Sequence, residues 1–133
     1  AVEADANYDF YDKLDGLFLV TAIPKSENAI EPLKEALSQQ IKKLQTTLVG
    51  KEELTRVKNQ IMARQVYKKD SMFGEARELG ILETIGLSWK LADKYVENID
   101  AVTPEQIQWV AKHYFQPEQL TIAVLLPQSQ RIK

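Results

Sequence analysis

The fold is decided within one stretch, which reads D-G-L-F-L-V-T-A-I-P-K-S-E-N-A-I-E-P-L-K-E-A-L and covers residues 15–37. Its first part, Leu17 to Ile23, is almost continuously apolar and stops at Pro24, which is typical of a strand buried on both faces. After Pro24 the apolar residues are spaced three and four apart from Ile30 onward, which predicts an amphipathic helix. The chain therefore changes from strand to helix at this proline.

The residues before this stretch predict a strand that pairs with it. Apolar side chains alternate with polar ones from Val2 to Phe10, and this period of two indicates one buried and one solvent-facing side. Residues 12–16 supply the Asp and Gly residues that a chain reversal needs. Residues 2–10 and 17–23 are therefore expected to form an antiparallel pair.

Helical spacing continues after the first helix. Asn28 and Glu31 resemble a capping box at the start of that helix, and Gly50 ends it. Gly80 lies inside a later helix at a cost of about 1 kcal/mol relative to Ala, which indicates close approach of another element. The expected segments are 30–48, then 54–69, then 71–86 with Ser71 as cap and Gly86 as end, then a helix capped by Ser88 with apolar residues through 91–96.

The strongest local signal is V-T-P-E-Q-I, residues 102–107. Thr103 is expected to be the N-cap, Pro104 to take the first helical position, and Gln106 to complete a capping box. The helix is expected to continue to Phe115. Residues 120–126, L-T-I-A-V-L-L, then predict a second fully buried strand.

The predicted order is β-β-α-α-α-α-α-β, which indicates an α+β fold with a mostly antiparallel sheet and a layer of helices on one face. With 133 residues, the length corresponds to a single domain over residues 1–133. Because a strand is expected to begin at residue 1 or 2, the chain is interpreted as a fragment whose preceding strands lie elsewhere.

Composition excludes several classes of function. The chain has no Cys and one His, so disulfide scaffolds, thiol catalysis and two-histidine metal motifs are excluded. With 17 basic and 19 acidic residues, the net charge of −2 provides no general attraction to nucleic acid. No apolar run reaches the ~20 residues of a membrane span, and neither phosphate-binding glycine motif is present.

No residue is assigned to a catalytic or metal site, and substrate-binding residues are unknown. His113 is expected to be a packed or surface histidine, because a hydrolytic zinc site needs about three protein ligands. No serine lies in a G-x-S-x-G elbow, so one histidine is no evidence of a triad. Trp89 and Trp109 are expected to be core or edge aromatic residues.

Positive charge is concentrated in residues 25–69, which hold ten basic and five acidic residues. The interleaved acids favour the interpretation of two solvated helix faces. The alternative is a surface that attracts an acidic partner or peptide. The basic residues that such a surface would use are Lys42, Lys43, Lys51, Arg56, Lys58, Arg64, Lys68 and Lys69.

The ordered combination of motifs is similar to part of the pitrilysin/insulinase family of zinc metallopeptidases. D-G-L-F-L-V-T-A-I-P at 15–24 and K-E-E-L-T-R-V-K-N-Q-I at 51–61 resemble a strand and the second helix of that family. E-L-G-I-L-E-T-I-G at 78–86, V-T-P-E-Q-I at 102–107 and the apolar segment 120–127 follow in the same order. The resemblance covers nearly the whole chain and rests on order and spacing.

The resemblance implies a protein built from repeated α/β halves, of which this chain is the later part of a non-catalytic C-terminal half. That half would close against a separate zinc-bearing half, or against a paired subunit, and enclose peptide substrates between them. The family's inverted H-x-x-E-H motif is missing from this sequence, so zinc is expected in the partner and none in this chain. The parent would be a zinc metalloendopeptidase, and this chain would be inactive alone. Localisation is unknown, and a periplasmic or envelope location follows from the resemblance only if the source is bacterial.

Two other functions stay open. One is a catalytically inactive structural or interaction module of the same fold that acts in protein assembly, and the other is a free-standing binder of an acidic partner. Self-association is also expected, through the unpaired strand edges of Val2–Phe10 or Leu17–Ile23, because unpaired edges invite pairing with another chain.

Overall fold

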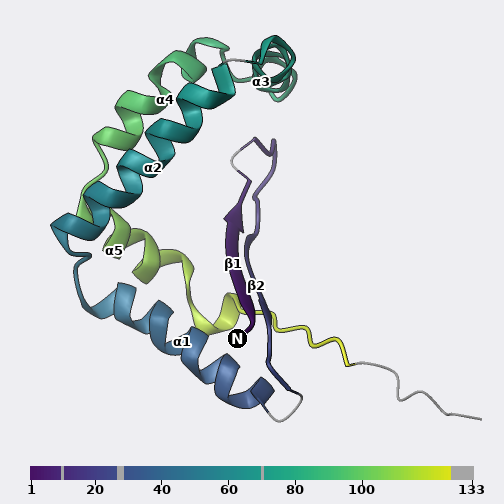
Figure 1. Ribbon diagram of the computed structural model, residues 1–133, viewed down its shortest axis with the longest axis vertical. Helices are drawn as coiled ribbons and strands as arrows, with labels where there is room; N and C mark the ends of the chain where they lie inside the picture. Colours follow the sequence, from purple (N-terminus) through teal and green to yellow (C-terminus); the bar gives the residue numbers. More distant parts are fainter. Residues whose placement is uncertain (10, 27–28, 70, 127–133) are drawn as a thin grey trace, which may run out of the picture.

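The computed structural model describes residues 1–9, 11–26, 29–69 and 71–126, without the side chains of 66–69. It is an α+β structure, 60% helical and 10% strand (Figure 1). The helices follow a pair of strands in the order β-β-α-α-α-α-α. The elements are β1 (Glu3–Tyr8), β2 (Phe18–Ile23), α1 (Ile30–Thr46), α2 (Lys51–Lys69), α3 (Met72–Thr84), α4 (Lys90–Asp100), α5 (Pro104–Tyr114) and a 3₁₀ turn, η2 (Pro117–Gln119).

The N-terminal hairpin is present as expected. β1 pairs antiparallel with β2, in a register that runs from Glu3 opposite Ile23 to Tyr8 opposite Phe18. In the turn, the Tyr11 N–H donates to Asp9 Oδ1 at 2.9 Å. The expected burial is wrong, however, because every residue of β1 and all of β2 except the half-buried Ala22 are exposed. Phe10 lies outside the described residues.

The predicted helices are all present, with small shifts at their starts. α1 begins after Ala29, and the proposed cap Asn28 lies outside the described residues. In α3 the Ser71 hydroxyl accepts from the Gly74 N–H at 3.1 Å, as predicted. α4 begins one residue late, because the Leu91 N–H donates to the Ser88 carbonyl and makes the first turn 3₁₀-like.

The capping box at the start of α5 is confirmed. The Thr103 hydroxyl accepts from the Gln106 N–H at 3.3 Å, and the Gln106 side chain accepts from the Thr103 N–H at 2.9 Å. Hydrogen bonds from its own backbone N–H and from the Thr103 hydroxyl, with the nearby charge of Lys51, lower the pKa of Glu105. The helix start is thus fixed by its own sequence, as the motif predicts.

The helices form two groups, which together curve around the hairpin (Figure 1). α1 packs against α5, while α2, α3 and α4 pack against one another. The Gln45 amide joins the first group, donating to the carbonyls of Ala111 at 3.2 Å and Phe115 at 2.8 Å. In the second group, Lys58 Nζ donates to the Asp100 carbonyl at 2.5 Å.

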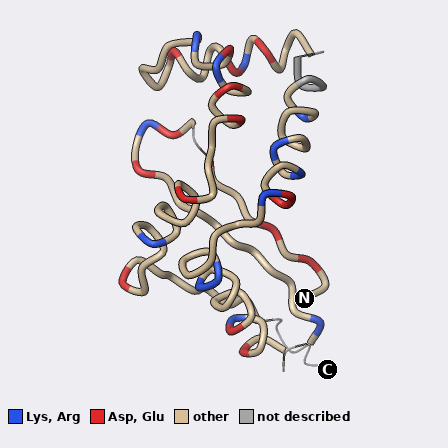
Figure 2. Tube along the Cα trace, turned by 90° about the vertical axis from the view of Figure 1, so that its left-hand side faces the viewer, with Lys and Arg blue, Asp and Glu red and all other residues tan. Residues whose placement is uncertain are grey.

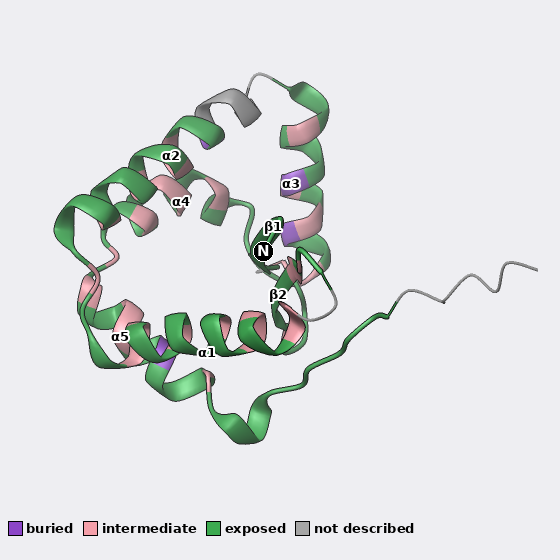
Figure 3. Ribbon diagram, turned by 60° about the horizontal axis from the view of Figure 1, so that its bottom comes forward, coloured by how far each residue is buried: buried purple, intermediate pink, exposed green. Residues whose placement is uncertain are grey.

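Little of the chain is buried (Figure 3). Among the described residues, Leu82 and Ala111 are the buried apolar side chains, at 4% and 1% exposure. The solvent-accessible surface is 11498 Å², whereas a compact monomer of this mass exposes roughly 7,100 Å². The expected layer of helices on one sheet face is therefore wrong, because the helices pack mainly on each other and leave the hairpin faces open.

The expected C-terminal strand is also absent. Residues 120–126 belong to no strand and are exposed throughout. A strand forms only where a neighbour supplies backbone partners, and the sheet of the described residues contains β1 and β2 alone. Figure 1 shows this segment running past the base of the hairpin and away from it.

No described helix combines the length and the apolar character that crossing a membrane requires.

Gly80 provides a test of the open packing. The expected close approach is wrong, because a Cβ built at Gly80 has no non-local neighbour within 4 Å. We therefore predict that Gly80→Ala raises the free energy of unfolding by about 0.5–1 kcal/mol through helix propensity.

Gly86→Ala is the matched comparison, since Gly86 has a φ of +85°. We expect this variant to lower the free energy of unfolding by about 1–2 kcal/mol. Urea denaturation of both variants measures the two signs; a loss of stability in Gly80→Ala would contradict the open site.

Candidate functional site

The described residues do not supply a metal site. No three His, Cys, Asp or Glu side chains within the described part of the chain are placed to hold an ion together. The sequence has one His and no Cys, whereas a catalytic zinc needs about three protein ligands. The residues present therefore do not fit a zinc ion, and no reaction step is assigned to one in this chain.

His113 lies in an exposed aromatic cluster on α5, made of Trp109, His113 and Tyr114. Its ring stacks on Trp109, with centroids 4.9 Å apart and planes 9° apart, and meets Tyr114 edge-on at 4.8 Å. Trp109 is 58% exposed. His113 is thus a surface histidine. Trp109, which was expected to be a core or edge residue, is exposed on the surface. Trp and Tyr are residue types that contribute strongly at protein interfaces.

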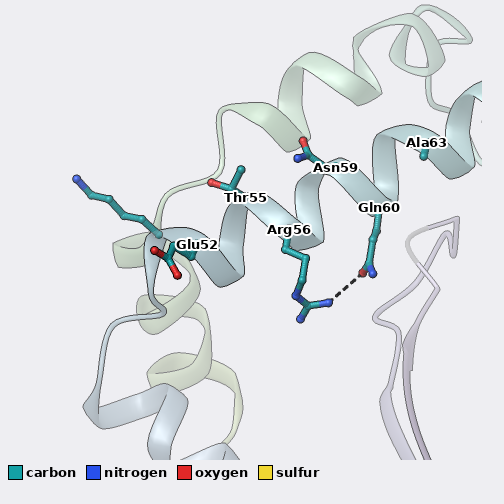
Figure 4. Close-up of a pocket in the computed structure, with 7 residues that line it drawn as sticks. Glu52, Thr55, Arg56, Asn59, Gln60 and Ala63 are labelled. Carbon is teal, nitrogen blue, oxygen red and sulfur yellow. Dashed lines mark hydrogen bonds between the residues drawn. The ribbon is translucent and has the colours of Figure 1, made fainter.

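A pocket of about 700 Å³ lies along one face of α2 (Figure 4). Its lining residues recur at helical spacing, so one helix builds it and the pocket is a surface feature. Arg56 Nη1 donates to Gln60 Oε1 at 3.4 Å within it. The lining residues are Lys51, Glu52, Thr55, Arg56, Asn59, Gln60 and Ala63.

The α2 pocket is an open hollow on the surface of one helix, and its lining includes charged and amide side chains. Lys51 and Arg56 supply positive charge, with Glu52 as the opposing charge. The Asn and Gln amides both donate and accept, as peptide groups require of a partner.

Only part of the predicted basic surface comes together. Of its eight members, Lys51 and Arg56 line the α2 pocket. Lys58 is half-buried and bonded to the end of α4. The side chains of Lys68 and Lys69 lie outside those described. Figure 2 shows Lys and Arg at several positions along α2, with the acidic residues Glu52 and Glu53 in its first turn.

Sequence reasoning missed a polar cluster that links the hairpin turn to the helices. Tyr11 in the turn donates its hydroxyl hydrogen to Glu78 Oε1 on α3. Glu78 is buried, at 8% exposure. The pKa of Tyr11 is raised well above its usual range, mainly by burial and then by the hydrogen bond to Glu78 and the charge of Glu78. The pKa of Tyr95 on α4 is also raised, by burial and by the charge of Glu78. Because 67 residues separate Tyr11 from Glu78, no local pattern could have indicated the pair.

No protein-family model matches this chain. No curated protein matches its sequence.

The Tyr11–Glu78 contact leads to a prediction about alkaline stability. Because Tyr11 ionises at higher pH when folded than its ordinary value of 10.0, the unfolded chain loses its proton first. The stabilisation is therefore complete below about pH 10 and falls as the pH rises above it. We predict that Tyr11→Phe lowers the free energy of unfolding at pH 7 by about 1–2 kcal/mol and reduces the alkaline loss.

The matched control is Tyr8→Phe, which removes a hydroxyl from an exposed β1 side chain. It should change the free energy of unfolding by less than about 0.5 kcal/mol. Urea titrations at pH 7, 9.5 and 11 make the comparison, and equal effects of the two variants would contradict a stabilising role for the Tyr11 contact.

Proposed function

We propose that this chain is a non-catalytic substrate-chamber domain of a zinc-dependent metalloendopeptidase, and that it closes against a separate zinc-bearing half to enclose peptides. The observation that carries the proposal is the exposed surface. The chain exposes about 4,400 Å² more than a compact monomer of its mass. Stable protein interfaces bury about 1,200–2,000 Å² in total, so the excess is large enough for docking against another polypeptide.

The motif order from residue 15 to residue 127 supports the choice of family. These motifs resemble the non-catalytic half of pitrilysin/insulinase peptidases, in which the opposite half contributes the metal. In this chain the residues would bind and enclose a peptide, and zinc held by the partner would activate the attacking water. The residues of the α2 pocket suit peptide binding, because they offer amide partners for the backbone and cations for a carboxylate.

The aromatic cluster of Trp109, His113 and Tyr114 is our candidate for contact with the zinc-bearing half. It combines the residue types that dominate interface energies with high exposure. Trp109 and His113 lie one turn apart on α5, about opposite Ala111, which is buried. Contact through this cluster would therefore leave the α1–α5 packing intact.

The direct test is reconstitution with the H-x-x-E-H polypeptide that we expect in the same or an adjacent reading frame. The two pieces together should cleave a fluorogenic peptide in a chelator-sensitive reaction, while each piece alone should not. Changing the glutamate within the partner's motif to glutamine should abolish cleavage but leave the complex intact. If neither the same nor an adjacent reading frame encodes the motif, or if the chain cleaves peptides alone, the proposal is contradicted.

The same experiment separates the peptidase from an inactive assembly module of the same fold. A stable complex with no peptide cleavage would identify the assembly module. Trp109→Ala should weaken either complex by about tenfold or more, whereas Trp89→Ala, a matched exposed tryptophan at the start of α4, should not.

A second candidate function is binding of an acidic partner, and the α2 pocket favours it because two cations of the basic stretch line it. We predict that Arg56→Gln weakens binding of a fluorescein-labelled oligoglutamate peptide about fivefold, the size of one exposed charge pair. Arg77→Gln, on α3 and outside the pocket, is the control. Fluorescence anisotropy measures peptide binding by both variants at two salt concentrations. Binding should weaken as salt is added, because salt screens the attraction between Arg56 and the acidic peptide. Equal effects of the two variants on binding would exclude the α2 pocket as the binding site for the acidic peptide.

A further inference from the structure

Residues 120–126 form a strand-like segment without a strand partner. Their sequence, L-T-I-A-V-L-L, contains no charged residue and is rich in β-branched and apolar side chains, which favour strands. The segment is extended and exposed, with Leu125 at 97%. Apart from the Leu120 N–H, which donates to the Pro117 carbonyl, its backbone groups pair with no strand of the described residues.

The two edges of the hairpin differ in how well they would accept such a strand. Within the described residues the sheet has two strands, so β1 and β2 each have one outer edge. β1 carries Glu3 and Asp5, whose charges oppose pairing with another chain, whereas β2 carries no charged residue. The outer edge of β2 is thus the one left open to an uncharged, apolar strand.

We propose that residues 120–126 of one copy add as a third strand to the outer edge of β2 in a second copy, and that two copies exchange these segments reciprocally. The lengths agree, since the segment has seven residues and β2 has six. Each copy holds both the strand and the edge, so two copies can exchange segments reciprocally in a closed, symmetric dimer. The pairing is independent of the zinc-peptidase proposal.

The path of the segment favours a second copy over its own sheet. The Phe115 ring packs on the Phe18 ring with centroids 4.8 Å apart, and the Leu120 N–H donates to the Pro117 carbonyl. After this turn the segment runs away from its own hairpin (Figures 1 and 3). Pairing with a second copy keeps these contacts, whereas pairing within one chain requires the segment to change direction after the turn.

The exposed area is sufficient for the exchange. A stable dimer buries about 1,200–2,000 Å² in total, and each copy exposes about 4,400 Å² beyond the compact value. The surfaces covered would include Phe18, Leu19, Val20 and Ile23 of β2, all of which are exposed in the single chain.

Sedimentation velocity of the full chain over a concentration series tests the proposal. We expect a monomer–dimer equilibrium. Replacing Thr121 and Ile122 together by Pro should raise the dimer dissociation constant about tenfold or more, because consecutive N–H groups point to opposite edges of a strand and one of the two lost donors therefore faces β2. Ile122→Val keeps both donors and removes one methylene group per copy, so it should weaken the dimer clearly less than the proline variant does. A monomer at every concentration, or equal effects of the two variants, would overturn the proposal.

A second pair of variants tests the edge. Leu19 and Asn7 are cross-strand partners, so they share one face of the hairpin. Leu19→Lys places a charge beside the added strand, whereas Asn7→Lys places it one strand farther away. Only Leu19→Lys should weaken the dimer by about tenfold. A larger effect of Asn7→Lys would assign the contact to β1 and contradict the proposal, and circular dichroism confirms that both variants fold.

Cross-linking distinguishes exchange between copies from pairing within one chain. The chain has no native Cys, so a Val20→Cys copy can be mixed with a Val124→Cys copy and treated with a short bismaleimide. Exchange predicts cross-linked dimers that contain one copy of each variant. The proposal would be overturned if the mixture gave no cross-linked dimers while a third sample, a single copy that carries both cysteines, formed cross-links only within one chain.

Discussion

The structure depends on one constraint, which is the small amount of apolar surface that this chain can bury by itself. Two apolar side chains, Leu82 and Ala111, are buried among the described residues. Hydrophobic burial is the main favourable term in folding, at roughly 25 cal/mol per Å². The chain leaves about 4,400 Å² of excess surface in water, and we propose that it gains further stabilisation by burying part of this surface against another polypeptide.

Polar contacts hold the open arrangement together where apolar packing is sparse. Gln45 joins α1 to the end of α5, and Tyr11 joins the hairpin turn to Glu78 on α3. Each hydrogen bond of this kind adds about 0.5–1.5 kcal/mol net, which orients elements but does not replace a core. The same openness exposes the surfaces on which both proposals depend, namely the α2 pocket, the aromatic cluster and the edge of β2.

The sequence predicted the local structure well and the burial poorly. The Thr103 capping box, the Ser71 cap, the hairpin and all five helices follow from signals within a few residues. Three predictions were wrong, namely the burial of residues 2–9 and 17–23, the strand at 120–126 and the close approach at Gly80. Each of them requires a neighbour that periodicity does not reveal. The α2 pocket lies within the predicted basic stretch, whereas the Tyr11–Glu78 pair spans 67 residues and left no local signal.

The central claim is that this chain completes its core against another polypeptide. The most direct measurement is the thermal unfolding midpoint of the full chain as a function of its concentration. Our account predicts a midpoint that rises with concentration, because association stabilises the folded form by mass action. A cooperative transition whose midpoint stays constant, from a species that remains monomeric, would show that the chain buries a sufficient core alone and would contradict the account.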